Sequence, residues 1–366
     1  MKIQMHFVRR GPVVAAAAAM GMALVAALIP CDAAVGQEDA RGRPADDRVP
    51  ELARYLDQVE IYAPSVYRHL AVFPIRLRDD GPLRGNWLTM DQALARGVLV
   101  IQEKGDRGVV PTVIVENRSR EDYVFILAGE LLAGGKQTRT VRQDILLAPG
   151  QTVDVNVFCV EAHRWEGETR FKSGSALAPA SLQQELRLGG DQHRIWSEVA
   201  RNNAALGAEN STGSLIIALQ TDKVRAVLIE IRDRVLPQVP GDTVGIIVVD
   251  RDRAVGAEFF GRHGLAVELL PKLLDAYAVD LILKRGDHPP VSPASQQEAA
   301  IAFFRRVQQA HSQHVATLGA GVGIRTRGGG LLGDGVSLDG AVVHYGVQIQ
   351  DRIIPLPSRP IVERPR

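Results

Sequence analysis

Two glutamates lie where an apolar run ends, an unfavourable place for a carboxylate unless it is paired. Val124–Ala128 is apolar throughout and leads almost directly into Glu130. One face of Val153–Val160 is apolar and ends at Cys159, and Glu161 continues that face. Burial raises the pKa of a carboxyl group, so one carboxylic acid can donate a proton near neutral pH while a second stays ionised. Glu130 and Glu161 are therefore candidate catalytic residues of a hydrolase.

Cationic and aromatic side chains follow each of these glutamates closely. A double-glycine turn after the first carries Lys136, Gln137 and Arg139, and the second is followed by Arg164 and Trp165. Arginine makes bidentate hydrogen bonds to carboxylate or phosphate, and tryptophan stacks on a flat or sugar face. If the two strand ends lie side by side, these residues form a binding site for a small anionic or polyhydroxyl ligand.

The same residues have other interpretations. Buried glutamates and arginines can pair with each other and connect strand ends for purely structural reasons. Cys159, Glu161 and His163 alternate on one strand face and could supply three metal ligands, but a lone cysteine in an apolar strand is usually core. No base is clearly placed beside Cys159 to make it a nucleophile. We expect no metal ion and no cofactor.

The segments around the two glutamates have the pattern of short β-strands. A helix interrupts them, since Thr89 and Gln92 form a capping box and Gly97 follows as a helix end. Runs rich in β-branched and aromatic residues are expected as strands at Leu70–Leu77, Val98–Gln102, Val109–Val115, Val124–Ala128, Ile145–Leu147 and Val153–Val160.

The second half of the chain mixes helices and strands. Asp339-Gly340 is a strong hairpin turn between Leu331–Leu338 and Ala341–Val347. Strands arranged in blocks predict an α+β fold, with an antiparallel, sandwich-like N-terminal half packed with a helix-rich second half. Helical spacing is found at Asp191–Asn202, Asp222–Val235, Leu265–Leu283 and Ser295–His314, and further strands at Val244–Val249 and Val255–Phe260.

The first thirty-six residues have the three-part pattern of a secretory signal. Basic residues precede the apolar run Val13–Ile29, and small residues end at Gly36, where we expect cleavage. The expected location is therefore periplasmic or extracellular. The alternatives are a membrane anchor formed by residues 13–29 or a lipid on Cys31.

The rest of the chain is expected to form one domain. Residues 37–58 are charged and predicted to be a disordered tether. The domain then covers 59–350, β-rich over 59–165 and mixed over 166–350, and a Pro/Arg-rich tail follows at 351–366.

The overall composition is that of an ordinary globular protein, with 46% apolar and 23% charged residues. Lys and Arg number 43 against 42 Asp and Glu, so no net charge attracts the chain to nucleic acid. With Cys31 in the leader, Cys159 has no partner for an internal disulfide. We expect no nucleic-acid partner and no membrane contact beyond an uncleaved leader, and the oligomeric state stays open.

The sequence contains the motifs GELLAGGKQTR, FCVEAHRW, QHRIW, YRHLAVFPI, TMDQALARG, FFGRHGLAVELLPKLLDAYAVDLI and DGAVVHYGV. Together they resemble one domain family, the ARG and rhodanese-phosphatase-superfamily-associated protein domain, which is uncharacterised. The resemblance runs roughly from Tyr62 to Gln348. The family is named for its association with ADP-ribosylglycohydrolases and phosphatase-like proteins, which hints at ADP-ribose or phosphate-ester chemistry. The resemblance implies no activity for the domain itself. The residues that the resemblance marks as site residues are Glu130, Gln137, Arg139, Glu161, Arg164 and Trp165, with Gln192 and Trp196 as looser members. The sequence departs from the family's pattern at His163.

Three functions fit these observations. The favoured one is an exported protein that binds an anionic or polyhydroxyl ligand resembling ADP-ribose or a phosphate ester. The second is a hydrolase with Glu130 and Glu161 as its carboxylate pair. The third is an envelope interaction protein in which the charges form a structural salt-bridge network.

Overall fold

The structure is a computed structural model that describes residues 48–79, 81–105, 111–283 and 291–350. The expected leader (1–36), the tail (351–366) and residues 37–47 of the expected tether lie outside these ranges.

The tether expected over residues 37–58 is wrong at its C-terminal end, because Pro50–Leu56 forms helix α1. Leu52 and Tyr55 face the core at a helical spacing of three, and the Tyr55 hydroxyl donates to the Phe260 carbonyl over 2.7 Å. The helix is short and surrounded by charged residues, so its apolar face was not recognised in the sequence.

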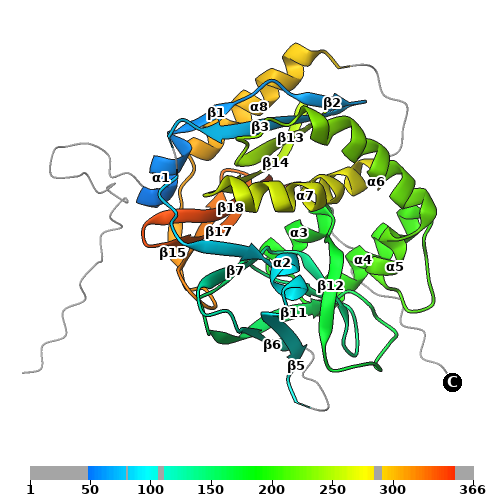
Figure 1. Ribbon diagram of the computed structural model, residues 1–366. Helices are drawn as coiled ribbons and strands as arrows, with labels where there is room; N and C mark the ends of the chain where they lie inside the picture. Colours follow the sequence, from blue (N-terminus) through cyan, green and yellow to red (C-terminus); the bar gives the residue numbers. More distant parts are fainter. Residues whose placement is uncertain (1–47, 80, 106–110, 284–290, 351–366) are drawn as a thin grey trace, which may run out of the picture. The chain divides into compact units, whose positions relative to one another are not determined.

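Half of the eighteen strands in the described ranges belong to one large sheet (Figure 1), in the order β1-β3-β13-β14-β18-β17-β16-β15, with β2 also paired to β3. All of its pairings are antiparallel. The strands are β1 (Val59–Ile61), β2 (Ser65–Tyr67), β3 (Leu70–Leu77), β13 (Gly245–Asp250), β14 (Arg253–Phe260), β15 (Gln313–Val315), β16 (Val322–Gly328), β17 (Leu331–Leu338) and β18 (Ala341–Ile349).

The centre of this sheet is buried on both faces. Along β13, Ile246 and Val248 join the core on the side of α7 (His263–Leu283), whereas Ile247 joins the core on the side of α8 (Pro293–Gln308). Successive side chains of a strand point to opposite faces, so a strand covered by helices on both sides must be apolar throughout.

A smaller, sandwich-like unit packs beside it. A three-stranded sheet (β10-β7-β4) faces a six-stranded sheet (β12-β8-β9-β11-β6-β5) across a shared apolar core. The pairings are antiparallel except β4 with β7. The strands are β4 (Asn86–Thr89), β5 (Leu99–Glu103), β6 (Thr112–Asn117), β7 (Asp122–Ile126), β8 (Glu130–Gly134), β9 (Arg139–Val141), β10 (Ile145–Leu147), β11 (Thr152–Cys159) and β12 (Phe171–Leu177).

The predicted α+β fold with a sandwich-like N-terminal part is confirmed. The two sheet systems do not, however, divide the chain at residue 165. Strands β1 to β3 pair into the large sheet through β13, and β12 returns to the sandwich beside β8. Such long-range pairings leave no local mark in the sequence.

Several predicted helices are present close to their expected bounds, but the helices at Ala180–Arg187 and Leu215–Leu219 were not expected. The capping box at Thr89 is present, and the closing hairpin turns at Asp339 and Gly340, which both have positive φ. The helix expected over Ser295–His314 ends at Gln308, and His314 instead lies on β15. The remaining helices are α2 (Met90–Ala95), α3 (Ala180–Arg187), α4 (Gln192–Leu206), α5 (Leu215–Leu219) and α6 (Asp222–Val235).

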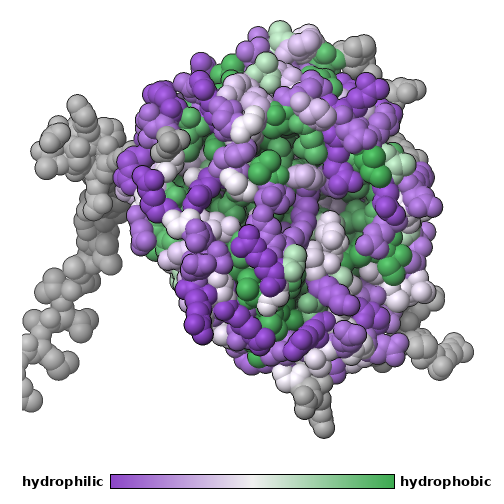
Figure 2. All heavy atoms as spheres, viewed as in Figure 1, coloured by the Kyte–Doolittle hydropathy of each residue, from purple (hydrophilic) through white to green (hydrophobic). Residues whose placement is uncertain are grey.

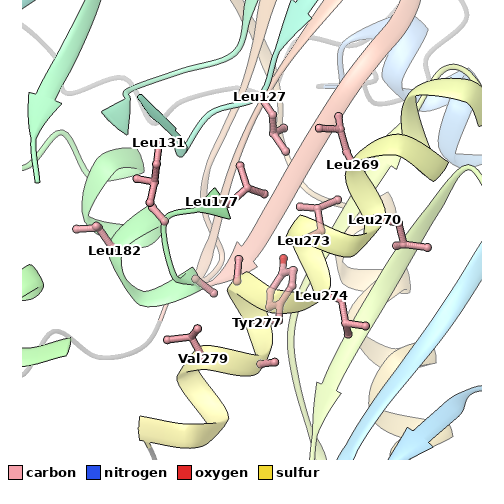
Figure 3. Close-up of a cluster of buried hydrophobic side chains, with 14 of the residues drawn as sticks. Leu127, Leu131, Leu177, Leu182, Leu269, Leu270, Leu273, Leu274, Tyr277 and Val279 are labelled. Atoms are coloured by element: carbon pink, nitrogen blue, oxygen red, sulfur yellow. The ribbon is translucent and has the colours of Figure 1, made fainter. Parts of the chain in front are cut away.

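Helix α7 joins the two sheet systems. Figure 3 shows its leucines facing side chains that come from the sandwich, among them Leu127, Leu131 and Leu177. On the face of the molecule in Figure 2, polar side chains predominate and apolar ones lie between them. Within the described ranges, no helix has the length and apolar character needed to cross a membrane.

Candidate functional site

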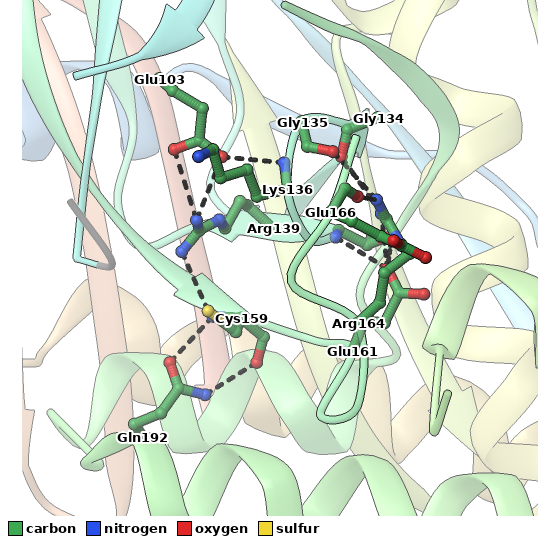
Figure 4. Close-up of polar contacts among 11 residues, drawn as sticks. Glu103, Gly134, Gly135, Lys136, Arg139, Cys159, Glu161, Arg164, Glu166 and Gln192 are labelled. Carbon is green, nitrogen blue, oxygen red and sulfur yellow. Dashed lines mark hydrogen bonds and ion pairs between the residues drawn. The ribbon is translucent and has the colours of Figure 1, made fainter. Parts of the chain in front are cut away.

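Arg139 is the centre of the predicted cluster, and it is fully buried. Its Nη2 lies 3.3 and 3.4 Å from the two carboxylate oxygens of Glu103, and its Nη1 lies 2.9 Å from the Sγ of Cys159 (Figure 4). The sheet places these groups together, because Cys159 on β11 is paired with Arg139 on β9. Trp165, 46% exposed, covers the guanidinium at 5.6 Å from its ring centroid.

Gln192 ties this cluster to helix α4. Its side-chain oxygen accepts from the Cys159 amide over 2.9 Å, and its side-chain nitrogen donates to the Cys159 carbonyl over 2.8 Å. The amide therefore extends the edge of β11 as another strand would. This role is structural.

Glu161 lies beside the turn between β8 and β9. It accepts from the amide and the hydroxyl of Thr138, at 3.0 and 2.9 Å, and from Nη2 of Arg164 at 2.8 Å. Burial opposes its ionisation, but these hydrogen bonds outweigh burial and lower its pKa. Arg164 also donates to the carbonyls of Gly134 and Gly135, so it holds the glycine turn in place.

Glu130 lies at the other end of the same hairpin. Its two oxygens lie 2.8 and 3.1 Å from the Nζ of Lys272 on α7, which also contacts Asp91 at 2.7 Å. Burial raises the Glu130 pKa to about 7, although Lys272 opposes the rise. Among the described residues, Glu130 and Glu161 share no partner, so the structure does not join them as one carboxylate pair.

The remaining predicted site residues are Lys136, Gln137 and Trp196. The Lys136 amide donates to Glu103 over 3.0 Å, and Gln137 is buried. Trp196 on α4 stacks edge-on against His193, 5.9 Å between centroids. In the part of the chain that is described, no group of three His, Cys, Asp or Glu residues is placed to hold a metal.

A partly open pocket of about 60 Å³, which the sequence did not indicate, lies elsewhere in the structure. We call it the arginine pocket, because four arginines and two aspartates line it. The lining residues are Ala128, Arg142, Gln143, Asp144, Leu186, Arg187, Arg325, Arg327 and Asp334. Four positive and two negative side chains leave a net charge of +2 on its wall.

Two of the arginines share one aspartate. Nε of Arg325 donates to Asp334 over 3.1 Å, and Nη2 of Arg327 donates to it over 2.6 Å. Arg327 also donates to the carbonyls of Gly333 and Arg187, so its guanidinium is held by the protein. Arg327 therefore builds the wall of the pocket.

Arg187, the last residue of α3, is different. Its side chain is 6% exposed, and its nearest carboxylate, Glu258, is 3.8 Å away. Its Nη1 is buried and has no hydrogen-bond partner among the described residues. Buried donors in folded proteins nearly always have a partner, so an unpaired guanidinium nitrogen in a pocket wall calls for an explanation.

A chain of buried polar groups runs from the pocket into the core. Asp144 in the wall contacts Nδ1 of His344 at 2.7 Å, and Nε2 of His344 contacts Glu258 at 3.0 Å. Tyr277 of α7 donates to Glu258 over 2.9 Å. We call these four residues the buried charge chain. Burial opposes the charge on His344, yet the two carboxylates outweigh it and raise its pKa to about 9.

The sequence contains a signal for these buried residues. His344 and Glu258 each interrupt an apolar strand, the feature that identified Glu130. Strands β14 and β18 are neighbours with His344 opposite Phe260, which puts His344 and Glu258 on one face.

A comparison with protein families agrees with the motifs. The profile of the ARG and Rhodanese-Phosphatase-superfamily-associated Protein domain, ARPP-1, matches residues 58–347. The chain belongs to this family. No match was found among curated proteins or solved structures. The ARPP-1 domain thus includes both sheet systems, the Arg139 cluster and every residue of the arginine pocket.

Proposed function

We propose that this ARPP-1 protein is exported and binds a small anionic ligand, of the phosphate-ester type, in the arginine pocket. The observation that carries the proposal is the unpaired Nη1 of Arg187 in a wall of net positive charge. A buried donor without a partner costs roughly 1–3 kcal/mol, and more for a charged group. An anion in the pocket would accept this hydrogen bond and balance the wall charge.

The proposal places the ligand away from the Glu/Arg/Trp cluster expected from the sequence. Arg139 faces Glu103 and Cys159, and Arg164 faces Glu161 and three carbonyls, so both guanidinium groups already have protein partners. Such pairing supports a structural role for the cluster. Export is proposed from the leader pattern of residues 1–36 alone.

Isothermal titration of the purified chain with inorganic phosphate at low salt tests the proposal. We expect Arg187→Gln to weaken binding by tenfold or more, since a hydrogen bond to a charged group contributes about 1.5–3 kcal/mol. Arg142→Gln removes an exposed pocket charge without disturbing the core and should weaken binding less. Arg234→Gln, an exposed arginine on α6, is the matched control.

Equal affinity in the wild type, Arg187→Gln and Arg142→Gln would refute the pocket as the site. Binding should also weaken as salt is raised, because exposed wall charges are screened. Binding that ignores salt would contradict the electrostatic argument.

A further inference from the structure

We infer that the ligand of the arginine pocket carries a terminal phosphate monoester on a hydroxyl-bearing body. The inference rests on the proposed function and adds the chemical class of the ligand. It assigns a single dianionic phosphoryl group to the pocket, in place of the bridged diphosphate of ADP-ribose.

Three of the four arginines in the pocket wall can still donate hydrogen bonds to a ligand. Arg187 has its unpaired Nη1, and Arg325 uses Nε for Asp334 while no described residue accepts from its two terminal nitrogens. Arg142 is exposed, with its guanidinium 5.8 Å from the Phe158 ring centroid. Three guanidinium groups on one pocket wall suit the three terminal oxygens of a phosphate monoester.

The net charge of the pocket wall matches that of a doubly charged ligand. The pocket wall carries a net charge of +2. In the buried charge chain behind it, the positive charge of His344 and the negative charge of Glu258 cancel. A phosphate monoester carries about −1.5 to −2 at neutral pH, whereas a sulfate ester or a simple carboxylate carries only one charge. A dianion therefore balances the wall, and a monoanion leaves it positive.

The pocket holds about 60 Å³ and is partly open to solvent, so the phosphoryl group can lie among the arginines while the body of the ligand extends outward. Gln143 and Asp144 on the wall can accept hydrogen bonds from hydroxyl groups. The carboxylate of Asp144 has a fixed orientation, since the Ala128 amide donates to one of its oxygens and His344 contacts the other.

The test compares four ligands by isothermal titration at low salt and pH 7.5: a hexose 6-phosphate, the matching hexose 6-sulfate, butyl phosphate and ADP-ribose. We expect the hexose phosphate to bind at least tenfold more tightly than each of the other three. Arg142→Gln and Arg325→Gln should each reduce its preference over the sulfate, while Arg234→Gln leaves the preference unchanged.

The outcomes separate the two proposals. Equal binding of the sulfate and phosphate esters would overturn the dianion, and equal binding of butyl phosphate would overturn the hydroxyl-bearing body. Tighter binding of ADP-ribose would overturn the terminal monoester. In all three cases the proposed binding of an anion in the arginine pocket would still be supported. If none of the four anions binds, the proposed function fails, and this inference fails with it.

Discussion

Raising the pH from 7 to 9 is expected to remove about 2 kcal/mol of folding stability through one side chain, His344. The imidazole is 1% exposed and lies between Asp144 at 2.7 Å and Glu258 at 3.0 Å. Both carboxylates favour the protonated ring, so its pKa rises from 6.5 to about 9 in the folded protein.

The sign follows from proton linkage. A base whose pKa is higher in the folded state stabilises the fold fully below its unfolded value, 6.5, and loses that contribution as the pH rises through about 9. At about 1.36 kcal/mol per unit of pKa, the full contribution is about 3 kcal/mol. About two thirds of it disappears between pH 7 and pH 9.

Urea denaturation at pH 7, 8 and 9 measures the loss. The wild type should lose about 2 kcal/mol of unfolding free energy across this range, and His344→Gln should lose much less. The buried Glu130, with a pKa of about 7, also lowers stability as the pH rises, but it does so equally in both proteins. His311→Gln, an exposed histidine, is the matched control and should keep the wild-type slope.

Parallel pH profiles for the wild type and His344→Gln would refute the reasoning. If His344→Gln does not fold, the His344 pKa can be measured in the wild type by NMR titration of the imidazole. A value at or below 6.5 would then show that the two carboxylates do not hold the charge as the distances indicate.

Two further predictions concern buried charges. Lys272→Ala leaves the Glu130 carboxylate buried without its cation and should lower the unfolding free energy by about 3–5 kcal/mol at pH 8; a loss below 1 kcal/mol in urea denaturation would contradict the ion pair. Gly346→Ala puts a Cβ 2.3 Å from Oε2 of Glu258 and 2.6 Å from Nη2 of Arg187, so it should cost about 1–3 kcal/mol and weaken phosphate binding, and normal stability with normal binding would refute the crowding argument.

Local structure could be predicted from the sequence because its causes are local. The exact strand Leu70–Leu77 was recognisable from its β-branched and aromatic run, and the hairpin at Asp339-Gly340 from its turn residues. The burial of Glu130 and Glu161 follows from the apolar runs that precede them, and Glu161 pairs with Arg164, three residues further along the chain. In each case the residue and its nearest neighbours in the chain carry the information.

The partners of these residues could not be predicted, because they come from distant parts of the chain. Lys272 reaches Glu130 from α7, 142 residues later, and His344 reaches Asp144 across 200 residues. Sheet pairing decides which of two hairpin ends a glutamate occupies, and register is set by tertiary packing. The expected convergence of Glu130 and Glu161 therefore required a geometry that strand patterns alone do not contain.

The buried charge chain also bears on the proposed anion site, because Asp144 belongs to both. Buried ion pairs contribute little net stability, and apolar residues of similar volume often replace them without loss. Asp144, His344, Glu258 and Tyr277 nevertheless occupy the core directly behind the arginine pocket. Glu258 is also the nearest carboxylate to Arg187, at 3.8 Å, too far for a hydrogen bond. The buried charge chain thus places a carboxylate near Arg187 without a hydrogen bond to it, as the proposed anion site requires.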